Sequence, residues 1–127
     1  MSFPAGLPPH ARLRRAADFA ALRKAPGRLD TRYFLIRFHA SAAAGARLGL
    51  AISKRVSKSA VQRNRIKRLT RESFRRARDD MPKVDVLVIA RSIAAAAENI
   101  VLRADLDRVW PRLQALKPGR APGTIVD

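Results

Sequence analysis

The chain has 127 residues, a length typical of one domain, and its hydrophobic content of 47% is that of a globular protein. Its formal net charge of +17 is exceptional and indicates a partner rich in negative charge. The excess lies in the first two thirds, because residues 1–78 carry 20 basic and 3 acidic side chains, whereas residues 79–127 carry 7 of each. This uneven distribution predicts a localised binding surface for nucleic acid.

Composition also excludes several classes of protein. The absence of cysteine rules out a disulfide framework and a thiolate metal site. No apolar run approaches the length of a membrane span, and the basic helix expected from Ala60 onward lacks the Trp/Phe/Leu-rich apolar face of an interfacial anchor, so we expect no membrane partner. The first residues place their charges after a short apolar patch interrupted by prolines, a pattern that does not match a signal peptide. We therefore expect a cytoplasmic protein.

The N-terminal region predicts an arm followed by a short helix. Residues 1–11 contain three prolines and a glycine, which favours a flexible arm. A helix is expected from about Ala16 to Lys24, where Pro26 and Gly27 stop it. Phe19 lies on the apolar side of this helix. It is either a core residue or a stacking platform for a nucleobase, since basic side chains are close by.

Two strands are expected next. Residues 32–39 alternate, so Phe34, Ile36 and Phe38 form a core face, with Tyr33, Leu35, Arg37 and His39 on the other. A second strand runs from about Arg47 to Ser53. One of its faces carries the small residues Gly49, Ala51 and Ser53, which leave room for a packed helix or for a polynucleotide. Residues 27–31 could add a short first strand.

The most one-sided stretch runs from Lys54 to Arg78, with eleven Lys and Arg residues against the single acid Glu72. From Ala60 it contains no Gly or Pro, and its apolar positions recur at the spacing of a buried helix face. The opposite arc carries Asn64, Lys67, Arg68, Arg71 and Arg75. A solvated helix face normally mixes signs of charge, so this face predicts polyanion binding. Arg63 falls near the apolar face, but in the first turn it can project off the helix end.

The last third predicts a buried strand and a helix. Residues 84–90 form a nearly continuous β-branched apolar run. A helix begins near Glu98 and presents Leu102, Leu106, Val109, Leu113 and Leu116 on one face, and Pro111 should end or kink it at Trp110. We expect Trp110 to be a core residue and residues 117–127 to form a disordered tail. The order α-β-β-(β)-α-β-α predicts an α+β fold with one sheet covered by helices.

No autonomous active site is evident. The ten acidic residues are scattered, and adjacent pairs such as Asp79 and Asp80 do not converge on one ion. Neither His10 nor His39 has an obvious acid–base partner. We find no metal-ligand cluster, phosphate loop or nucleophile elbow, so any reactive groups must come from a partner.

The block Arg63-Asn64-Arg65-Ile66-Lys67-Arg68-Leu69-Thr70-Arg71, with LGLAISKRV before it, resembles the signature of the bacterial ribonuclease P protein family. Its Arg-Asn-Arg core and Lys-Arg pair stand at the family spacing. Asp18 and Phe19, and the run VDVLVIAR ahead of a final helix, agree with the resemblance, which covers residues 12–116.

This resemblance implies a single two-layer domain with a mixed sheet and a left-handed β-α-β crossover, against the usual right-handed rule. It also implies a 1:1 complex with a catalytic RNA that removes the 5′ leader of precursor tRNA. Mg²⁺ would be held mainly by the RNA subunit and the substrate. A structural RNA-binding protein of ribosomal type is the alternative that composition leaves open.

Carried over by position, the resemblance assigns two sets of residues. The contacts to the catalytic RNA would be Lys54, Arg55, Arg63, Asn64, Arg65, Lys67, Arg68 and Arg71. The leader groove would use Arg12, Arg14, Phe19, Arg23, Tyr33, Arg37 and Ser53. Arg23 and Arg37 stand where the family often has aromatic residues. Their guanidinium planes still permit stacking and add contacts to phosphate.

Overall fold

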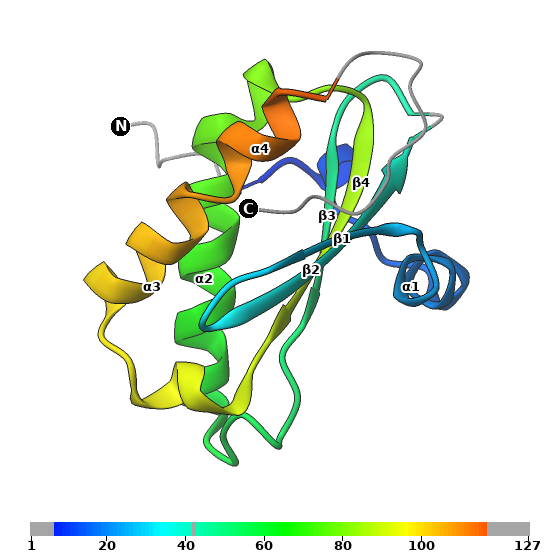
Figure 1. The fold of residues 1–127 in the computed structure, drawn as a ribbon. Coiled ribbons are helices and arrows are strands. Elements are labelled where there is room, and N and C mark those ends of the chain that lie inside the picture. Colours follow the sequence, from blue (N-terminus) through cyan, green and yellow to red (C-terminus); the bar gives the residue numbers. More distant parts are fainter. Residues whose placement is uncertain (1–6, 42, 117–127) are drawn as a thin grey trace, which may run out of the picture.

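The computed structural model describes residues 7–41 and 43–116, and Figure 1 shows the arrangement of its elements. The α-helices are α1 (Ala16–Arg23), α2 (Ala60–Ala77), α3 (Asn99–Asp107) and α4 (Trp110–Gln114). The strands are β1 (Gly27–Asp30), β2 (Phe34–Ala40), β3 (Arg47–Ala51) and β4 (Val84–Ala90). Short 3-10 turns span Pro9–Ala11, Arg78–Asp80 and Ser92–Ala96. The predicted order of elements is confirmed, including the short first strand.

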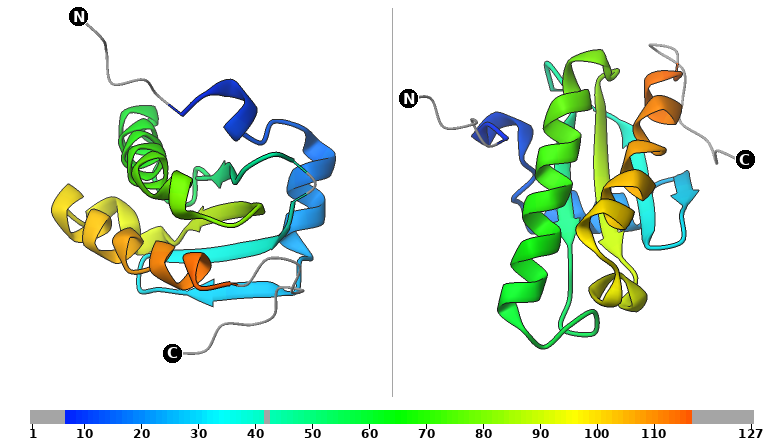
Figure 2. Two further views of the ribbon diagram at one scale, coloured as in Figure 1. Left: turned by 90° about the horizontal axis from the view of Figure 1, so that it is seen from above. Right: turned by 90° about the vertical axis from the view of Figure 1, so that its left-hand side faces the viewer.

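The strands form one mixed sheet in the order β1-β2-β4-β3. Antiparallel pairing joins β1 to β2 and β2 to β4, whereas β3 and β4 are parallel. Helix α2 connects this parallel pair. In the right-hand view of Figure 2, α2 lies in front of the sheet, β3 and β4 run downward, and β4 lies to the right of β3. The crossover is therefore left-handed, as the family resemblance implies.

The main core lies between the sheet and helices α2, α3 and α4. Phe34, Ile36 and Phe38 point into it and are fully buried, which confirms the alternation predicted for β2. Helix α2 contributes Ile66 and Phe74 from its apolar face. Ser59 caps the N-terminus of this helix, because its side-chain hydroxyl accepts a hydrogen bond from the backbone N–H of Gln62 at 3.3 Å. The apolar periodicity of α2 thus determines which side of the helix faces the sheet.

Helix α1 covers the opposite face of the sheet, as the left-hand view of Figure 2 shows. There Leu22 and Ala25 pack against Leu87 of β4 in a second, smaller core. The molecule therefore has helices on both faces, one layer more than the two expected. The reason lies in β4, whose nearly continuous apolar run presents hydrophobic side chains to both sides and requires cover on both.

Residues 7–11, which composition placed in a flexible arm, are packed instead. Leu7 is 2% exposed and belongs to the main core, and Ala11 is fully buried. The chain then runs beside β3, where the Leu13 N–H donates to the Leu48 carbonyl at 2.8 Å. This strap, defined as residues 7–13, covers the otherwise open edge of β3. The proposed tail, residues 117–127, and the first six residues of the arm lie outside the described residues.

The C-terminal helices confirm the predicted break, because α3 ends at Asp107 and α4 starts at Trp110, next to Pro111. Trp110 is buried, as expected for a core residue. Its indole N–H donates to the Ser73 hydroxyl at 2.7 Å, and its ring meets Phe74 edge-on with centroids 5.4 Å apart. These contacts dock α4 onto α2.

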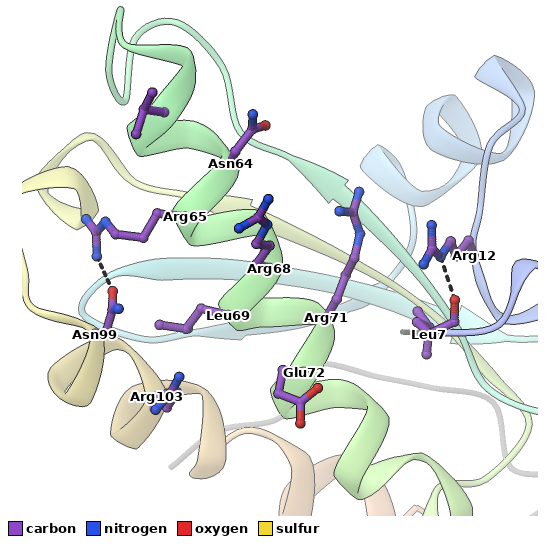
Figure 3. Close-up of a pocket in the computed structure, with 11 residues that line it drawn as sticks. Leu7, Arg12, Asn64, Arg65, Arg68, Leu69, Arg71, Glu72, Asn99 and Arg103 are labelled. Atoms are coloured by element: carbon purple, nitrogen blue, oxygen red, sulfur yellow. Dashed lines mark hydrogen bonds between the residues drawn. The ribbon is translucent and has the colours of Figure 1, made fainter. Parts of the chain in front are cut away.

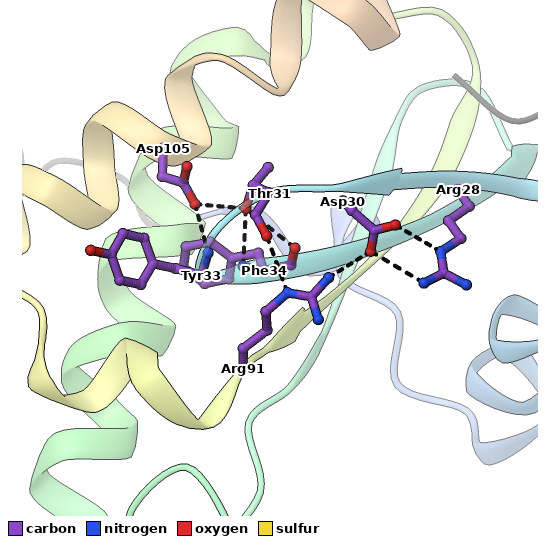
Figure 4. Close-up of polar contacts among 7 residues, drawn as sticks. All are labelled: Arg28, Asp30, Thr31, Tyr33, Phe34, Arg91 and Asp105. Carbon is purple, nitrogen blue, oxygen red and sulfur yellow. Dashed lines mark hydrogen bonds and ion pairs between the residues drawn. The ribbon is translucent and has the colours of Figure 1, made fainter. Parts of the chain in front are cut away.

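A buried carboxylate ties the turn between β1 and β2 to α3 (Figure 4). Asp105 accepts hydrogen bonds from the Thr31 hydroxyl at 2.6 Å and from the backbone N–H of Tyr33 at 3.1 Å. Arg91, just after β4, donates to Asp30 at 2.6 Å and to the Thr31 carbonyl at 3.1 Å. These bonds hold the turn against α3 on one side and against the end of β4 on the other.

Replacing Trp110 with Phe keeps an aromatic ring against Phe74 but removes the buried bond to Ser73. We expect the free energy of unfolding to fall by about 1–3 kcal/mol, the usual cost of losing one partner of a buried hydrogen bond. Urea denaturation followed by circular dichroism measures the change. Ile100→Ala is the control, since Ile100 is 73% exposed and its loss should change stability by less than about 0.5 kcal/mol. Equal stability of wild type and Trp110→Phe would refute the docking role.

Candidate nucleic-acid interface

Helix α2 presents a row of polar and cationic side chains that the protein does not use internally. Asn64, Lys67 and Arg68 have no hydrogen-bond or ion-pair partner among residues 7–41 and 43–116. Asn64 and Arg68 are exposed, and Lys67 is partly so. Like charges three and four positions apart on a helix repel one another. An anion lying along this face would relieve that repulsion.

The row borders a concavity of about 820 Å³ that is lined by α2, by α3 on one side of it and by the strap on the other (Figure 3). Its lining consists of Leu7, Arg12, Val61, Asn64, Arg65, Arg68, Leu69, Arg71, Glu72, Asn99 and Arg103. Glu72 is the single acid in this lining. Arg75 and Arg76 contact its carboxylate at 2.6 and 3.2 Å and hold the pKa of Glu72 below its usual value, chiefly through the hydrogen bond from Arg75. The concavity therefore keeps an excess of positive charge.

Arg71 lines both this concavity and a smaller hollow of about 180 Å³, and Leu7 and Arg12 of the strap also line both. Partial burial lowers the pKa of Arg71, and the charge of Arg12 lowers it further. Arg12 donates to the Leu7 carbonyl at 2.7 Å, a bond within the strap that brings no negative charge. Arg12 and Arg71 both line this smaller hollow, and no acidic side chain is part of its lining, which favours a phosphate there.

The smaller hollow brings together residues of both predicted sets. Arg12, Arg14 and Phe19, assigned to the leader, line it beside Lys67 and Arg71, assigned to the catalytic RNA. The two proposed surfaces are therefore continuous at Arg12 and Arg71. Sequence positions 12 and 71 lie far apart, and the strap alone brings them together.

Phe19 lies partly buried over Gly49, and a Cβ atom at that glycine would come within 3.0 Å of the phenyl ring. The space left by the small face of β3 is thus occupied by a packed helix, one of the two expected occupants. Phe19 also packs against the second core and lines the hollow. Part of the ring supports α1, and the remainder is accessible from the basic hollow.

Two arginines of the signature block are engaged inside the protein. Arg63 projects off the start of α2, as anticipated, and donates to the carbonyls of Ser57 and Lys58 at 2.8 and 2.9 Å. Arg65 donates to the Gln62 side chain at 2.9 Å and to the side chain of Asn99, the first residue of α3, at 2.6 Å (Figure 3). Arg63 and Arg65 therefore have hydrogen-bond partners within the protein. The neighbouring side chains of Asn64 and Arg68 have none among the described residues.

Ser53, Lys54 and Arg55 form an exposed turn ahead of α2, and the Ser53 hydroxyl accepts the Arg55 backbone N–H at 3.2 Å. Buried Val56 anchors the turn. Lys54 and Arg55 are thus accessible to solvent near the start of α2. Ser53, assigned to the leader, lies in this turn and does not line the hollow beside Phe19.

Three other residues assigned to the leader do not line the hollow beside Phe19. Tyr33 lies on the α3 side of the sheet, under the Arg32 guanidinium at 5.5 Å, and is therefore not in the groove (Figure 4). It belongs to the turn before β2, where strand alternation has not yet begun. Arg37 is on the α1 side, but its guanidinium donates to the Ala25 carbonyl at 3.1 Å. Arg23 is exposed at the end of α1.

Sequence reasoning missed Arg103 and Asn99, which line the concavity from α3. Their spacing of four residues puts them on one helix face, but nothing in the local sequence shows that this face turns toward α2. No group of three His, Asp or Glu residues that could hold a metal occurs in the described part of the chain. Nor is any described helix long and apolar enough to span a membrane.

Comparison with known proteins agrees with this geometry. The family model described as Ribonuclease P matches residues 7–114. The ribonuclease P protein component of Thioalkalivibrio sulfidiphilus is 38% identical over 89% of this chain and 94% of its own length. That of Legionella pneumophila (strain Lens) is 37% identical over 80% and 88% of the two chains.

Solved structures give the same result. The ribonuclease P protein of Staphylococcus aureus superposes with a TM-score of 0.74 at 29% identity, over 80% of this chain and 94% of that one. The protein from Thermotoga maritima superposes with a TM-score of 0.72 at 29% identity, over 84% and 100%. The chain therefore belongs to the ribonuclease P family, as a protein component of the ribonucleoprotein that processes tRNA.

Proposed function

We propose that this protein binds the catalytic RNA of ribonuclease P along α2 and the 5′ leader of precursor tRNA in the hollow beside Phe19. One protein would bind one RNA, in the cytoplasm. The observation that carries the proposal is the continuous basic surface, in which Lys67 and Arg71 of α2 share the hollow with Arg14 and Phe19. A leader entering this hollow would pass directly onto the face that meets the catalytic RNA.

The hollow suits a single strand better than a duplex. Its volume of about 180 Å³ is small, and it combines one partly accessible aromatic ring with cationic side chains. Single-stranded nucleic acid is commonly bound in this way, with bases stacked on aromatic rings and the backbone held by positive charge. Stacking on a phenyl ring accepts any base, so we expect the leader to be bound with little sequence preference.

The chemistry of leader removal belongs to the RNA in this proposal. Mg²⁺ would be held mainly by the RNA subunit and the substrate, where it would activate water and stabilise the leaving oxygen. The residues of this chain would neutralise phosphates that otherwise repel each other around the cleavage site. With that repulsion reduced, the RNA and its substrate should assemble with less Mg²⁺. The alternative of a structural ribosomal-type protein predicts no such effect on cleavage.

Reconstitution tests the proposal. A bacterial ribonuclease P RNA is incubated with precursor tRNA at low Mg²⁺, with and without the protein, and the 5′ ends are mapped. We expect strong stimulation of correct cleavage by the protein and no cleavage by the protein alone. Tight binding to the RNA without stimulation would support the structural alternative.

Replacing Arg68 with Ala removes an exposed cation from the centre of the α2 face. We expect affinity for the catalytic RNA to fall about three- to ten-fold near 0.15 M salt, and the slope of log affinity against log salt to decrease by about 0.7–0.9, because fewer counterions are released. Filter binding over a salt series measures both. Arg28→Ala is the matched control, since Arg28 is an exposed arginine on β1, at the opposite edge of the sheet from β3. If the two variants have the same salt slope, α2 does not contact the catalytic RNA.

Replacing Phe19 with Leu keeps an apolar side chain over Gly49 but removes the aromatic ring. If the ring stacks a base, binding of precursor tRNA by the holoenzyme should weaken by about 1–3 kcal/mol, while mature tRNA lacking the leader binds as before. Competition binding with the two substrates measures this difference. Equal weakening of both would mean that Phe19 serves the packing of α1 only.

A further inference from the structure

Helix α3 forms the second wall of the α2 concavity and carries a cation that no family motif marked. Arg103 is exposed, lines the concavity together with Arg68, and lies on the same side of α3 as Asn99 (Figure 3). Within the described residues, neither Arg103 nor Arg68 has a hydrogen-bond or ion-pair partner. Helices α2 and α3 thus each contribute one such guanidinium group to the lining of the concavity.

The single carboxylate in the lining of the concavity, that of Glu72, does not pair with Arg68 or Arg103. Glu72 accepts two hydrogen bonds from Arg75, at 2.6 and 3.1 Å, and a third from Arg76 at 3.2 Å. Its negative charge is directed toward the C-terminal end of α2 by these contacts. Arg68 and Arg103 are left to an external anion, and planar guanidinium groups match the oxygen atoms of phosphate.

The separation of the two walls is set by Arg65. Its guanidinium donates to the Asn99 side chain at 2.6 Å and to the carbonyls of Ala95 and Ala97 at 3.2 and 3.3 Å. These acceptors all belong to the segment that leads into α3 and to its first turn. Arg65 therefore joins the first third of α2 to the start of α3, on the same side as the concavity.

We infer that Arg103 is an RNA-binding residue that holds the backbone of the catalytic RNA opposite Arg68, and that Arg65 is the positioning residue for this pair. The inference rests on the proposed function and extends the RNA interface from one helix to two. The RNA backbone lies in the concavity with phosphates contacted from both walls. Arg65 acts through the placement of α3 and does not itself touch the RNA.

The first test compares Arg103→Ala with Arg108→Ala, using full-length protein and a bacterial ribonuclease P RNA. Arg108 caps the C-terminus of the same helix, but it lines a different surface, beside Asp105. Replacing it with Ala removes the same charge as Arg103→Ala does. We expect Arg103→Ala to lower affinity about three- to ten-fold near 0.15 M salt and to reduce the salt slope by about 0.7–0.9. Arg108→Ala should leave the slope unchanged.

Arg68→Ala in the same series separates this inference from the proposed function. If Arg68→Ala lowers the slope and Arg103→Ala behaves like Arg108→Ala, α3 is not part of the interface and only the inference fails. If neither Arg68→Ala nor Arg103→Ala changes the slope, α2 does not bind the RNA and the proposed function fails with it.

The second test examines the positioning role with Asn99→Ala, which weakens the link but leaves the charge of Arg65 in place. In the Asn99→Ala background, Arg103→Ala should lower the affinity for the RNA by less than about two-fold. Arg68→Ala should lower it as much as it does in the wild-type background. An undiminished effect of Arg103→Ala would overturn the positioning role.

Arg65→Ala gives a complementary result. If Arg65 positions Arg103, the slope should fall by about 0.7–0.9 and adding Arg103→Ala should change it no further. If Arg65 contacts RNA directly, the two reductions should add, and the inference about Arg65 is wrong. Fluorescence of Trp110 and circular dichroism verify that each variant is folded. If Arg65→Ala does not fold, the Asn99→Ala experiment alone decides whether Arg65 positions Arg103.

Discussion

The structure depends on one constraint, which is that α2 must bury an apolar face while carrying a dense row of cations on the other. Ile66, Leu69 and Phe74 are almost fully buried against the sheet. Burial of side chains of this size stabilises a fold by roughly 1.5–3 kcal/mol each, enough to offset the repulsion among neighbouring cations. The cations are therefore held in a fixed array while still lacking counter-charges, which prepares the surface for a polyanion.

The arginines of α2 fall into two groups with different tasks. Arg63 donates hydrogen bonds to backbone carbonyls just before α2, and Arg65 donates to the Gln62 and Asn99 side chains and to backbone carbonyls before α3. Arg68 and Arg71 make no such bonds among the described residues and face the concavity. The same residue type thus builds the frame and supplies the binding surface. The distinction depends on which backbone acceptors happen to lie within reach.

The strap has a comparable double role. By pairing with the edge of β3 it protects an open strand, and by burying Leu7 it becomes a fixed wall between the two hollows. Arg12 is thereby held close enough to Arg71 to lower its pKa. The second face of the sheet is covered by α1, so Phe19 reaches the border of the same basic surface. The residues that protect this edge are thus the same ones that would bind the two RNA segments in the proposed function.

The sequence by itself determined the elements, the buried face of β2, the cationic face of α2 and the helix break at Pro111, because each follows from the periodicity or chemistry of a local stretch. The Arg-Asn-Arg block indicated the family. Only the tertiary structure decided that Leu7 is packed, that Tyr33 lies beside α3, that Arg65 is bound to Asn99 and that Arg103 lines the same concavity as Arg68. Periodicity shows which side of an element is apolar. It carries no information on the polar neighbours that a distant segment brings to the other side, since those follow from long-range packing.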